Sequence, residues 1–143
     1  NPTVELDYEI INLDELNLYG VGITTNNDEI GKDAPIFFRQ TEDKYLNKYG
    51  EVKYGMITYD IEREESQKYY CLYDKEIEEF EHITIPKSKW LRFRINSQNA
   101  KDIQEISHKF YGEFLPSVKY NLTELPELEY YHDGVTDFLV AIY

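Results

Sequence analysis

The chain has 143 residues, the size of one domain with a single sizeable core, so the sequence predicts one compact unit over residues 1–143. Its 15 Lys and Arg against 28 Asp and Glu give a formal net charge of −13, which repels phosphate backbones and argues against direct nucleic-acid binding. A single cysteine excludes an internal disulfide, and no apolar run is long enough to cross a membrane, so we expect a cytoplasmic protein.

Tyrosine is unusually frequent, with 14 Tyr beside 7 Phe and 1 Trp. A tyrosine ring has a large apolar face and a polar tip, which suits a partly hydrated cleft or interface better than a dry core. Ligand pockets combine many apolar side chains with a few polar groups, so we expect about a quarter of the aromatic residues to line a pocket. The others should pack in the core.

The first part of the chain predicts a strand segment and a helix. Residues 4–25 are rich in residues that favour strands, and they predict a strand, an irregularity at residues 12–15, and the continuation of that strand. In the helix that follows, Asp33 is a candidate N-cap. Gly50 is a candidate C-terminal cap, so the helix should end there.

Four short strands are predicted after this helix. Residues 54–60 and 68–73 predict an antiparallel pair, joined by an acidic stretch, residues 60–65, that we interpret as a solvated loop. Residues 82–85 predict another strand. In residues 89–95 apolar side chains alternate with Trp and Arg, so one face should be core and the other should be wet or line a cleft.

The last part of the chain predicts a second helix and a hairpin. The helix should begin near Asn99, and its apolar residues keep a 3.6-residue period as far as residue 115. Residues 127–131 and 136–143 then predict two strands, joined by a turn that contains an Asp-Gly pair. Such a pair is typical of a tight hairpin.

This order of elements predicts an internal duplication. The series strand, helix, strand, strand occurs twice, in a first repeat over about residues 4–75 and a second over about residues 80–143. The sequence therefore predicts an α+β fold of two β-α-β-β halves related by a pseudo-twofold axis. We expect antiparallel sheets, two main helices and a cleft between the halves.

Motifs for metal, nucleotide and nucleophilic chemistry are missing from the sequence. The three histidines stand far apart, and no H-E-x-x-H, C-x-x-C or glycine-rich phosphate loop occurs. Cys71 is flanked by Tyr70 and Leu72 in a predicted strand, which is typical of a small buried hydrophobic residue. We therefore expect no metal site, no cofactor and no catalytic residue.

Four short segments carry a resemblance to a known family. I-P-K-S-K-W at residues 85–90 is similar to a family segment I-P-x-G-x-[aromatic], and Y-G-E-F-L-P-S at residues 111–117 to a helix end Y-x-E-W-L-P-S. V-K-Y-N-L at residues 118–122 is similar to S-G-Y-E-L, and L-E-Y-Y at residues 128–131 to a strand F-E-x-Y. In these segments the chain resembles the GyrI-like family, also described as the AraC-type effector-binding domain.

The resemblance implies a cleft between the halves that binds lipophilic cations and other small amphipathic effectors. Members are often fused to a DNA-binding head of the AraC or MerR type, and free-standing members include gyrase inhibitors and a few hydrolases. In multidrug-binding members a glutamate of the Y-E-L segment supplies buried negative charge. Asn121 stands at that position here, and its amide offers only dipoles where a desolvated cation needs a full charge.

Glu129 is the remaining carboxylate of these motifs. It is either an acid of the cleft or a strand residue that bonds a neighbouring backbone group. The other candidates for contact with a ligand are Phe37, Tyr54, Tyr70, Trp90, Phe110, Tyr120 and Asn121. For each aromatic candidate, core packing is the alternative explanation.

Three functions are open from the sequence. The first is the sensor domain of a bacterial transcriptional regulator, and the start at Asn1 fits a fragment of such a protein. The second is a free-standing acidic protein, similar to a gyrase inhibitor, that binds a protein partner through its charge. The third is a small hydrolase that uses Glu129 as general base and a tyrosine as acid.

Overall fold

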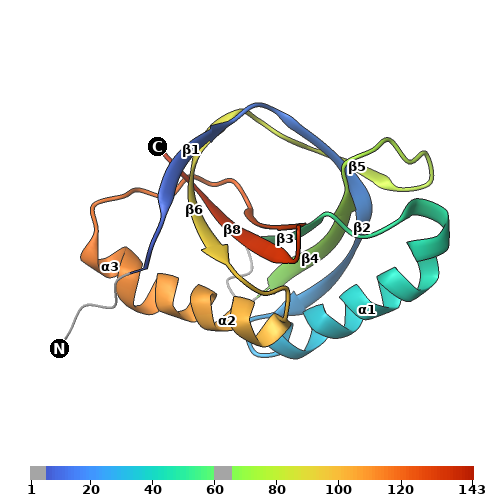
Figure 1. The fold of residues 1–143 in the computed structure, drawn as a ribbon, viewed down its shortest axis with the longest axis horizontal. Coiled ribbons are helices and arrows are strands. Elements are labelled where there is room, and N and C mark those ends of the chain that lie inside the picture. The colour runs from blue at the N-terminus through green and yellow to red at the C-terminus, as the bar shows by residue number, and fades with distance from the viewer. Residues whose placement is uncertain (1–5, 60–65) are drawn as a thin grey trace.

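The computed structural model describes residues 6–59 and 66–143, in which two halves of similar make-up follow one another along the chain (Figure 1). The predicted acidic loop, residues 60–65, lies outside the described residues. The first half contains β1 (Glu9–Leu13), β2 (Leu16–Asn26), α1 (Ile30–Tyr49), β3 (Tyr54–Tyr59) and β4 (Ser66–Tyr73). The second half contains β5 (Glu81–Ile85), β6 (Ser88–Ile95), α2 (Ala100–Lys109), η1 (Phe110–Phe114), α3 (Leu115–Ser117), β7 (Glu127–His132) and β8 (Val135–Ile142).

The eight strands of the described residues form one antiparallel sheet, in the order β1-β6-β8-β7-β3-β4-β2-β5. Strands β1 to β4 of the first half correspond to β5 to β8 of the second half. When each strand is replaced by its counterpart, the order from one edge becomes the order from the other edge. β3 and its counterpart β7 form the central pair. The first strand of each half pairs with the second strand of the other half. This topology confirms the predicted α+β fold of duplicated halves. The halves share a single sheet because β3 is hydrogen-bonded to β7.

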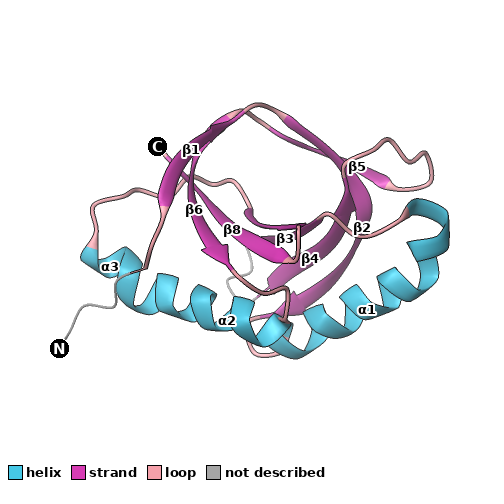
Figure 2. Ribbon diagram, in the orientation of Figure 1, coloured by secondary structure: helices cyan, strands magenta, loops and turns pink. Residues whose placement is uncertain are grey.

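The sheet is strongly curled (Figure 2). α1 and α2 lie on the same face, and the sheet curls away from them, while the links β1–β2 and β5–β6 cross its open side (Figure 1). The two helices meet at their N-terminal ends, where the Gln104 side chain donates a 2.8 Å hydrogen bond to the carbonyl oxygen of Gly31. This contact ties the two halves together on the helix side.

The sequence predicted that one strand with an irregularity spans this region, but β1 and β2 are two separate strands. β1 pairs with β6 near one edge of the sheet, whereas β2 pairs with β4 and β5 near the other edge. The short link between them carries the chain across the open side of the curl (Figure 1). A pattern of apolar and polar residues indicates a strand but does not name its partners, which here belong to opposite ends of the sheet.

Apolar side chains fill two cores, one on each face of the sheet. The first core lies between the sheet and the helices and contains Leu91, Phe93 and Ile95 of β6, as the alternation predicted. The second core lies on the open side of the curl, and Trp90 is fully buried in it. The sequence predicted that the face of β6 that carries Trp90 is wet or lines a cleft. At Trp90 this face is instead packed in the second core.

α1 begins at Ile30, three residues before the candidate N-cap Asp33. The Asp33 carboxylate lies in the first turn, where it suits the helix dipole and accepts a 2.8 Å hydrogen bond from the hydroxyl of Thr25. Gly50 ends the helix as predicted, with φ of 83°, and its N–H donates to the carbonyl oxygen of Leu46 over 2.9 Å.

The second helix changes its hydrogen bonding where the sequence predicted a regular period. α2 follows Asn99 as expected, but residues 110–114 form the π-helical turn η1, which carries i→i+5 hydrogen bonds. From this turn the Tyr111 hydroxyl reaches the carboxylate of Glu127 at the start of β7. Turns of this kind often lie at functional sites.

The predicted hairpin is confirmed. His132 pairs with Val135, and the two residues between them, Asp133 and Gly134, have φ of 48° and 75°. Two consecutive positive φ angles are typical of a type I′ turn, which the Asp-Gly pair favours. Among the residues that the structure describes, no helix combines the length and the apolar composition that a bilayer crossing needs.

Candidate functional site

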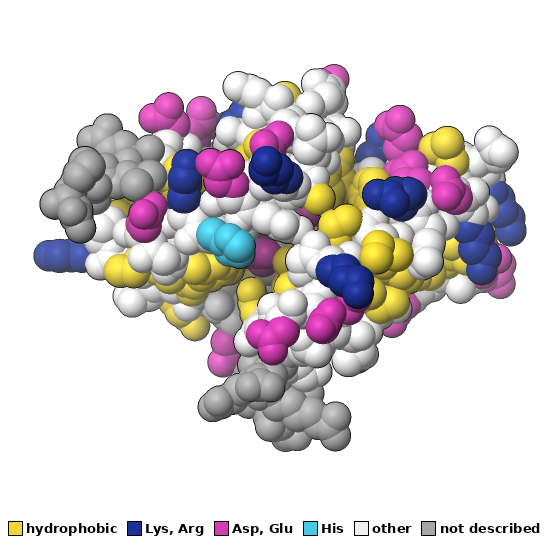
Figure 3. Space-filling model, turned by 90° about the horizontal axis from the view of Figure 1, so that it is seen from below, with side chains coloured by type: hydrophobic (Ala, Val, Ile, Leu, Met, Phe, Trp, Pro, Cys, Tyr) yellow, Lys and Arg dark blue, Asp and Glu magenta, His cyan; other side chains and the backbone are white. Residues whose placement is uncertain are grey.

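A cavity of about 740 Å³ opens on the helix side of the molecule (Figure 3). α1 packs on β2 and β4, and α2 packs on β6 and β8, so the central strands β3 and β7 are left between the two helices. The volume is in the range that a drug-sized ligand needs. The cavity is lined by Pro35, Phe38, Arg39, Glu42, Glu51, Val52, Lys53, Tyr69, Gln98, Asn99, Ala100, Ile103, Gln104, Glu129, Tyr131, His132, Asp133 and Gly134.

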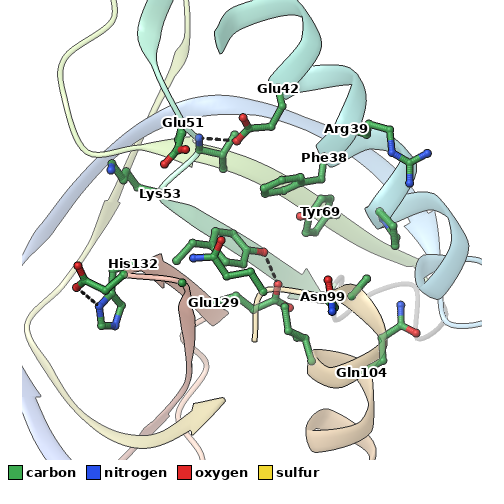
Figure 4. Close-up of a pocket in the computed structure, with 18 residues that line it drawn as sticks. Phe38, Arg39, Glu42, Glu51, Lys53, Tyr69, Asn99, Gln104, Glu129 and His132 are labelled. Atoms are coloured by element: carbon green, nitrogen blue, oxygen red, sulfur yellow. Dashed lines mark hydrogen bonds and ion pairs between the residues drawn. The ribbon is translucent and has the colours of Figure 1, made fainter. Parts of the chain in front are cut away.

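β7 directs two carboxylates and a tyrosine towards the helix side of the sheet. Because side chains alternate along a strand, Glu127, Glu129 and Tyr131 share one face of β7. The Tyr131 hydroxyl donates a 2.6 Å hydrogen bond to Oε1 of Glu129 (Figure 4). The Tyr111 hydroxyl donates a 2.9 Å hydrogen bond to Oε1 of Glu127. Each acid therefore has a neutral hydroxyl as its partner.

Gly55 makes room for the polar groups around Glu129. It lies on β3 directly opposite Glu129 in the antiparallel register. A Cβ at position 55 would stand 2.7 Å from the Tyr131 hydroxyl, 3.1 Å from Oε1 of Glu129 and 3.3 Å from the Tyr69 hydroxyl. Three polar atoms therefore converge over this glycine, and any larger residue would push them apart.

Aromatic rings form the wall of the cavity above these groups. Phe38 of α1 lies edge-on to Tyr131, with ring centroids 5.3 Å apart. Tyr69 of β4 lines the same cavity. Phe37 does not line the cavity, but its ring packs edge-on against the Tyr69 ring, with centroids 6.3 Å apart. The arrangement presents flat apolar surfaces close to the Glu129 carboxylate (Figure 4). Such surfaces bind aromatic rings and, through their π-electrons, cations.

Charged side chains of both signs surround the mouth of the cavity (Figure 3). Glu42 of α1 is held by the backbone N–H of Val52, which donates a 2.9 Å hydrogen bond to its carboxylate. His132 lies between two carboxylates, 3.0 Å from Asp133 and 2.8 Å from Asp137. Glu42 and His132 therefore already have hydrogen-bond partners, and Glu129 is the carboxylate of the cavity lining that lies beside the aromatic rings.

Burial changes the proton affinity of both acids of β7. Burial raises the pKa of Glu129, although the hydrogen bond from Tyr131 acts in the opposite direction. Burial and then the charge of Glu129 raise the pKa of Glu127 to about 8, against the effect of Tyr111. Glu127 is only 4% exposed, whereas the Glu129 side chain is partly accessible from the cavity. Within residues 6–59 and 66–143, neither carboxylate forms an ion pair.

The arrangement suits binding through charge and π-electrons better than metal or thiol chemistry. Over the described part of the chain, no three His, Cys, Asp or Glu side chains come together in a way that could hold a metal ion. Cys71 is fully buried, and burial raises the pKa of its thiol to about 12. A thiol in that state is a poor nucleophile.

Of the eight residues predicted to contact a ligand, the structure places Glu129 in the lining of the cavity. Phe37 and Phe110 pack in or against the first core, next to the cavity wall. Trp90, Tyr70 and Tyr54 belong to the second core, on the opposite face of the sheet.

Tyr120 and Asn121 lie on the segment before β7, outside the cavity lining. The hydroxyl of Tyr120 lies 2.9 Å from that of Tyr8, and the backbone carbonyl of Asn121 accepts a 3.1 Å hydrogen bond from the N–H of Tyr143. The Asn121 side chain is exposed. The structure therefore does not bring these two residues together with Glu129.

Several residues in or next to the cavity were not among the predicted ligand contacts. Phe38, Tyr69 and Tyr131 form its wall, and Glu127 is the second acid of β7. The alternation Glu127-x-Glu129-x-Tyr131 in a predicted strand was the available signal, because it puts all three on one face. Tyr69 and Phe38 carried no comparable signal, since their places depend on which strands and helices become neighbours.

Comparison with known proteins identifies related sequences and folds. Residues 9–143 match the model of a family described as integron-associated effector binding protein. No curated protein sequence is significantly similar to the chain. The solved structure of SAV2435 bound to tetraphenylphosphonium is 15% identical, over 96% of this chain and 94% of its own, with a TM-score of 0.82.

Two further solved structures share the fold. An integron cassette protein from the mobile metagenome of Vibrio cholerae is 14% identical over 95% of this chain and 95% of its own, with a TM-score of 0.74. The C-terminal domain of EcmrR is 11% identical over 98% of this chain and 99% of its own, with a TM-score of 0.55. At these identities the likeness concerns the fold alone.

Proposed function

We propose a function from one premise: the chain belongs to the family of integron-associated effector binding proteins. This membership confirms the resemblance to effector-binding domains and makes the chain a binding domain for a small molecule. Within that class, we propose that the ligand is a lipophilic cation with aromatic groups. It binds in the cavity between α1 and α2, with Glu129 as its charge partner.

The observation that carries this proposal is the state of Glu129. Its carboxylate lies at a cavity of about 740 Å³ and has a tyrosine hydroxyl as its hydrogen-bond partner. Holding a charge in such surroundings without a counter-ion is costly, and a bound cation would supply the missing charge. Burial already raises the pKa of this group, which is the signature of that cost.

The aromatic wall supports the choice of a cation with aromatic groups. Phe38, Tyr69 and Tyr131 offer ring faces and edges within one cavity, and rings stabilise cations most where water is excluded. The net charge of −13 also attracts cations to the protein from solution. A further support is that SAV2435, which shares the fold, was solved with tetraphenylphosphonium bound.

A pair of probes of equal shape and opposite charge tests the proposal. Tetraphenylphosphonium and tetraphenylborate are titrated into the purified chain, and binding heats are recorded at two salt concentrations. We expect saturable binding of the cation, weaker at high salt, and little or no binding of the anion. Equal binding of both ions, or binding of neither, contradicts the proposal.

We further propose that the domain is the sensor of a bacterial transcriptional regulator in the cytoplasm, fused to a DNA-binding head outside this chain. The fold also occurs as the C-terminal domain of EcmrR, which supports its use as one part of a longer protein. A ligand that prefers one conformation of the domain would shift the population of such a head. Sequencing the complete gene and looking for a basic helix-turn-helix beside this domain tests the idea.

Hydrolysis is a second candidate, and the short contact between Glu129 and Tyr131 favours it. A carboxylate that accepts a 2.6 Å hydrogen bond from a tyrosine could activate water while the hydroxyl protonates a leaving group. Incubation with activated esters and epoxides tests this, and product formation that disappears in Glu129→Gln would support it. The remaining alternative, an acidic inhibitor of a protein partner, rests on the net charge alone.

A further inference from the structure

We infer that the cavity exchanges a proton for its ligand: when a cation binds beside Glu129, a proton leaves the carboxyl group of Glu127 and passes to solvent. The inference rests on the proposed function, because it concerns the same site. Charge is conserved locally, since one positive charge enters as another leaves. Glu127 does not line the cavity, so it is a positioning residue that acts through the charge on Glu129.

The geometry couples the two carboxyl groups. They lie two residues apart on one face of β7, which separates them by about 7 Å along the strand. At that separation inside a protein, a unit charge changes a proton affinity by roughly tenfold to a hundredfold. Glu127 is 4% exposed, so water screens this interaction poorly. The two groups therefore do not ionise independently.

Among residues 6–59 and 66–143, the groups that face this pair are neutral hydroxyls and a thiol. Tyr111 of η1 contacts Glu127, and Tyr59 of β3 lies beyond it. Tyr69 and Cys71 of β4 and Tyr131 of β7 lie near Glu129. The charged groups of the cavity, further from Glu127, are Arg39, Glu42, Glu51, Lys53, His132 and Asp133. Burial raises the pKa of Tyr69, Tyr111 and Tyr131, so these hydroxyls stay neutral near pH 7.

The direction of the coupling follows from these charges. Burial and the charge of Glu129 raise the pKa of Glu127 to about 8, so in the empty site Glu127 keeps its proton at neutral pH. A cation beside Glu129 cancels that repulsion and lowers the pKa of Glu127. When binding releases protons, affinity rises with pH, by at most tenfold per pH unit for one proton. The cation should therefore bind more tightly as the pH rises from about 6.5 to 8.

Calorimetry of the intact chain with tetraphenylphosphonium tests this inference. Binding heats at about pH 7.5 are compared in phosphate and in Tris, whose heats of ionisation differ, and affinity is measured between about pH 6 and 8.5. We expect wild type to release a measurable fraction of a proton and to gain about fivefold to tenfold in affinity from pH 6.5 to 8. Glu127→Gln should lose both effects, because an amide cannot release a proton in this range.

Controls separate this inference from the proposed function. Glu124→Gln removes an exposed acid three residues away, and it should behave like wild type. Binding without proton release in wild type, or equal release in Glu127→Gln, overturns the inference and leaves the proposed function standing. No binding of the cation by wild type at any pH overturns the proposed function itself. If Glu127→Gln fails to fold, Tyr111→Phe is the alternative variant, because it removes the hydrogen bond to Glu127. Proton release on cation binding should then shift to higher pH. A pH profile of proton release that does not shift also overturns the inference.

Discussion

The hydroxyl of Tyr131 donates a 2.6 Å hydrogen bond to Oε1 of Glu129, and both side chains belong to the same face of β7. The contact satisfies one lone pair of the carboxylate without neutralising its charge. A lysine or arginine in that place would have formed an internal ion pair and left nothing for a ligand. The cavity is therefore lined by an acid that is hydrogen-bonded to a neutral group, which leaves it able to attract a positive charge.

Replacing Glu129 by glutamine should weaken the binding of tetraphenylphosphonium by on the order of tenfold or more, because the cation loses a poorly hydrated charge partner. The amide has the same shape, so circular dichroism should show an unchanged fold. Titration calorimetry measures the effect. Glu51→Gln is the matched control, since Glu51 is an exposed acid at the edge of the same cavity and should change affinity less than about twofold. Equal losses in the two variants would mean that general charge, and not Glu129, holds the ligand.

Alanine at position 55 should disturb the site from the opposite strand. Its Cβ would stand 2.7 Å from the Tyr131 hydroxyl, so the ring must move and the contact with Glu129 must change. We expect a loss of stability of about 1–3 kcal/mol, typical of overpacking, together with weaker cation binding. Gly112→Ala is the control, because nothing lies within 4 Å of a Cβ at that position. Thermal unfolding and calorimetry of both variants decide whether space at Gly55 matters.

The fold was largely predictable from the sequence, and particular elements show why. Asp133-Gly134 fixes a tight turn through backbone conformation alone, and Gly50 ends α1 for a similar reason. Such signals are local and act through φ angles or side-chain periodicity. The pairing of β1 with β6 was not predictable, because it joins segments about 80 residues apart and no local signal names the partner. The π turn at residues 110–114 was missed because its apolar residues also fit a 3.6-residue period.

The candidate site was less predictable than the fold. Glu129 stood out because it belongs to a motif and lies in a strand with polar and aromatic neighbours. The sequence also predicted ligand contacts for aromatic residues, yet Trp90, Tyr54 and Tyr70 face the second core. The face to which a strand residue points follows from alternation, but which of the two faces carries the helices depends on tertiary structure. In a sheet with a core on both sides, aromatic character alone cannot distinguish a pocket from packing.

The aromatic wall should contribute to ligand affinity independently of the charge. Phe38→Ala removes a ring that lines the cavity and lies 5.3 Å from Tyr131, and we expect about fivefold to tenfold weaker binding of tetraphenylphosphonium. The measurement is the same calorimetric titration. Leu46→Ala, on the same helix but 46% exposed and outside the lining, should leave affinity unchanged. Unchanged binding by Phe38→Ala would place the ligand away from α1.

Restoring a glutamate at position 121 should not improve cation binding. In the GyrI-like family, the segment that residues 118–122 resemble carries a glutamate at this position. In this chain the Asn121 side chain is exposed and lies outside the cavity lining. A surface carboxylate is well hydrated and screened, so Asn121→Glu should change affinity by less than about twofold. Dye titration or calorimetry at low salt gives the most sensitive comparison. A gain of tenfold would show that the ligand reaches the segment before β7 and that the cavity between α1 and α2 is not its whole site.

The buried acid Glu127 should make stability depend on pH in a direction that can be worked out. Its pKa is about 8 in the folded chain, above the ordinary value of 4.5 that an unfolded chain restores. At pH values below both pKa values, Glu127 is protonated in the folded and in the unfolded state, so it does not change the free energy of unfolding. Between them only the unfolded state loses its proton, so wild type loses about 1.4 kcal/mol of stability per pH unit relative to a variant without this acid. Glu127→Gln should therefore gain stability over wild type as the pH rises from 5 to 8, and the difference should level off above that.

Urea unfolding at several pH values, followed through the fluorescence of Trp90, measures this difference. Trp90 is a suitable reporter because it is fully buried in the second core, on the face of the sheet opposite Glu127. Subtracting the two unfolding free energies at each pH cancels the contributions of those shared acids that do not interact with Glu127. A difference that stays constant from pH 5 to 8 would mean that Glu127 is ionised in the folded protein throughout, which requires a positive partner for it. A difference that grows with pH supports a protonated Glu127, the state from which ligand binding could release a proton.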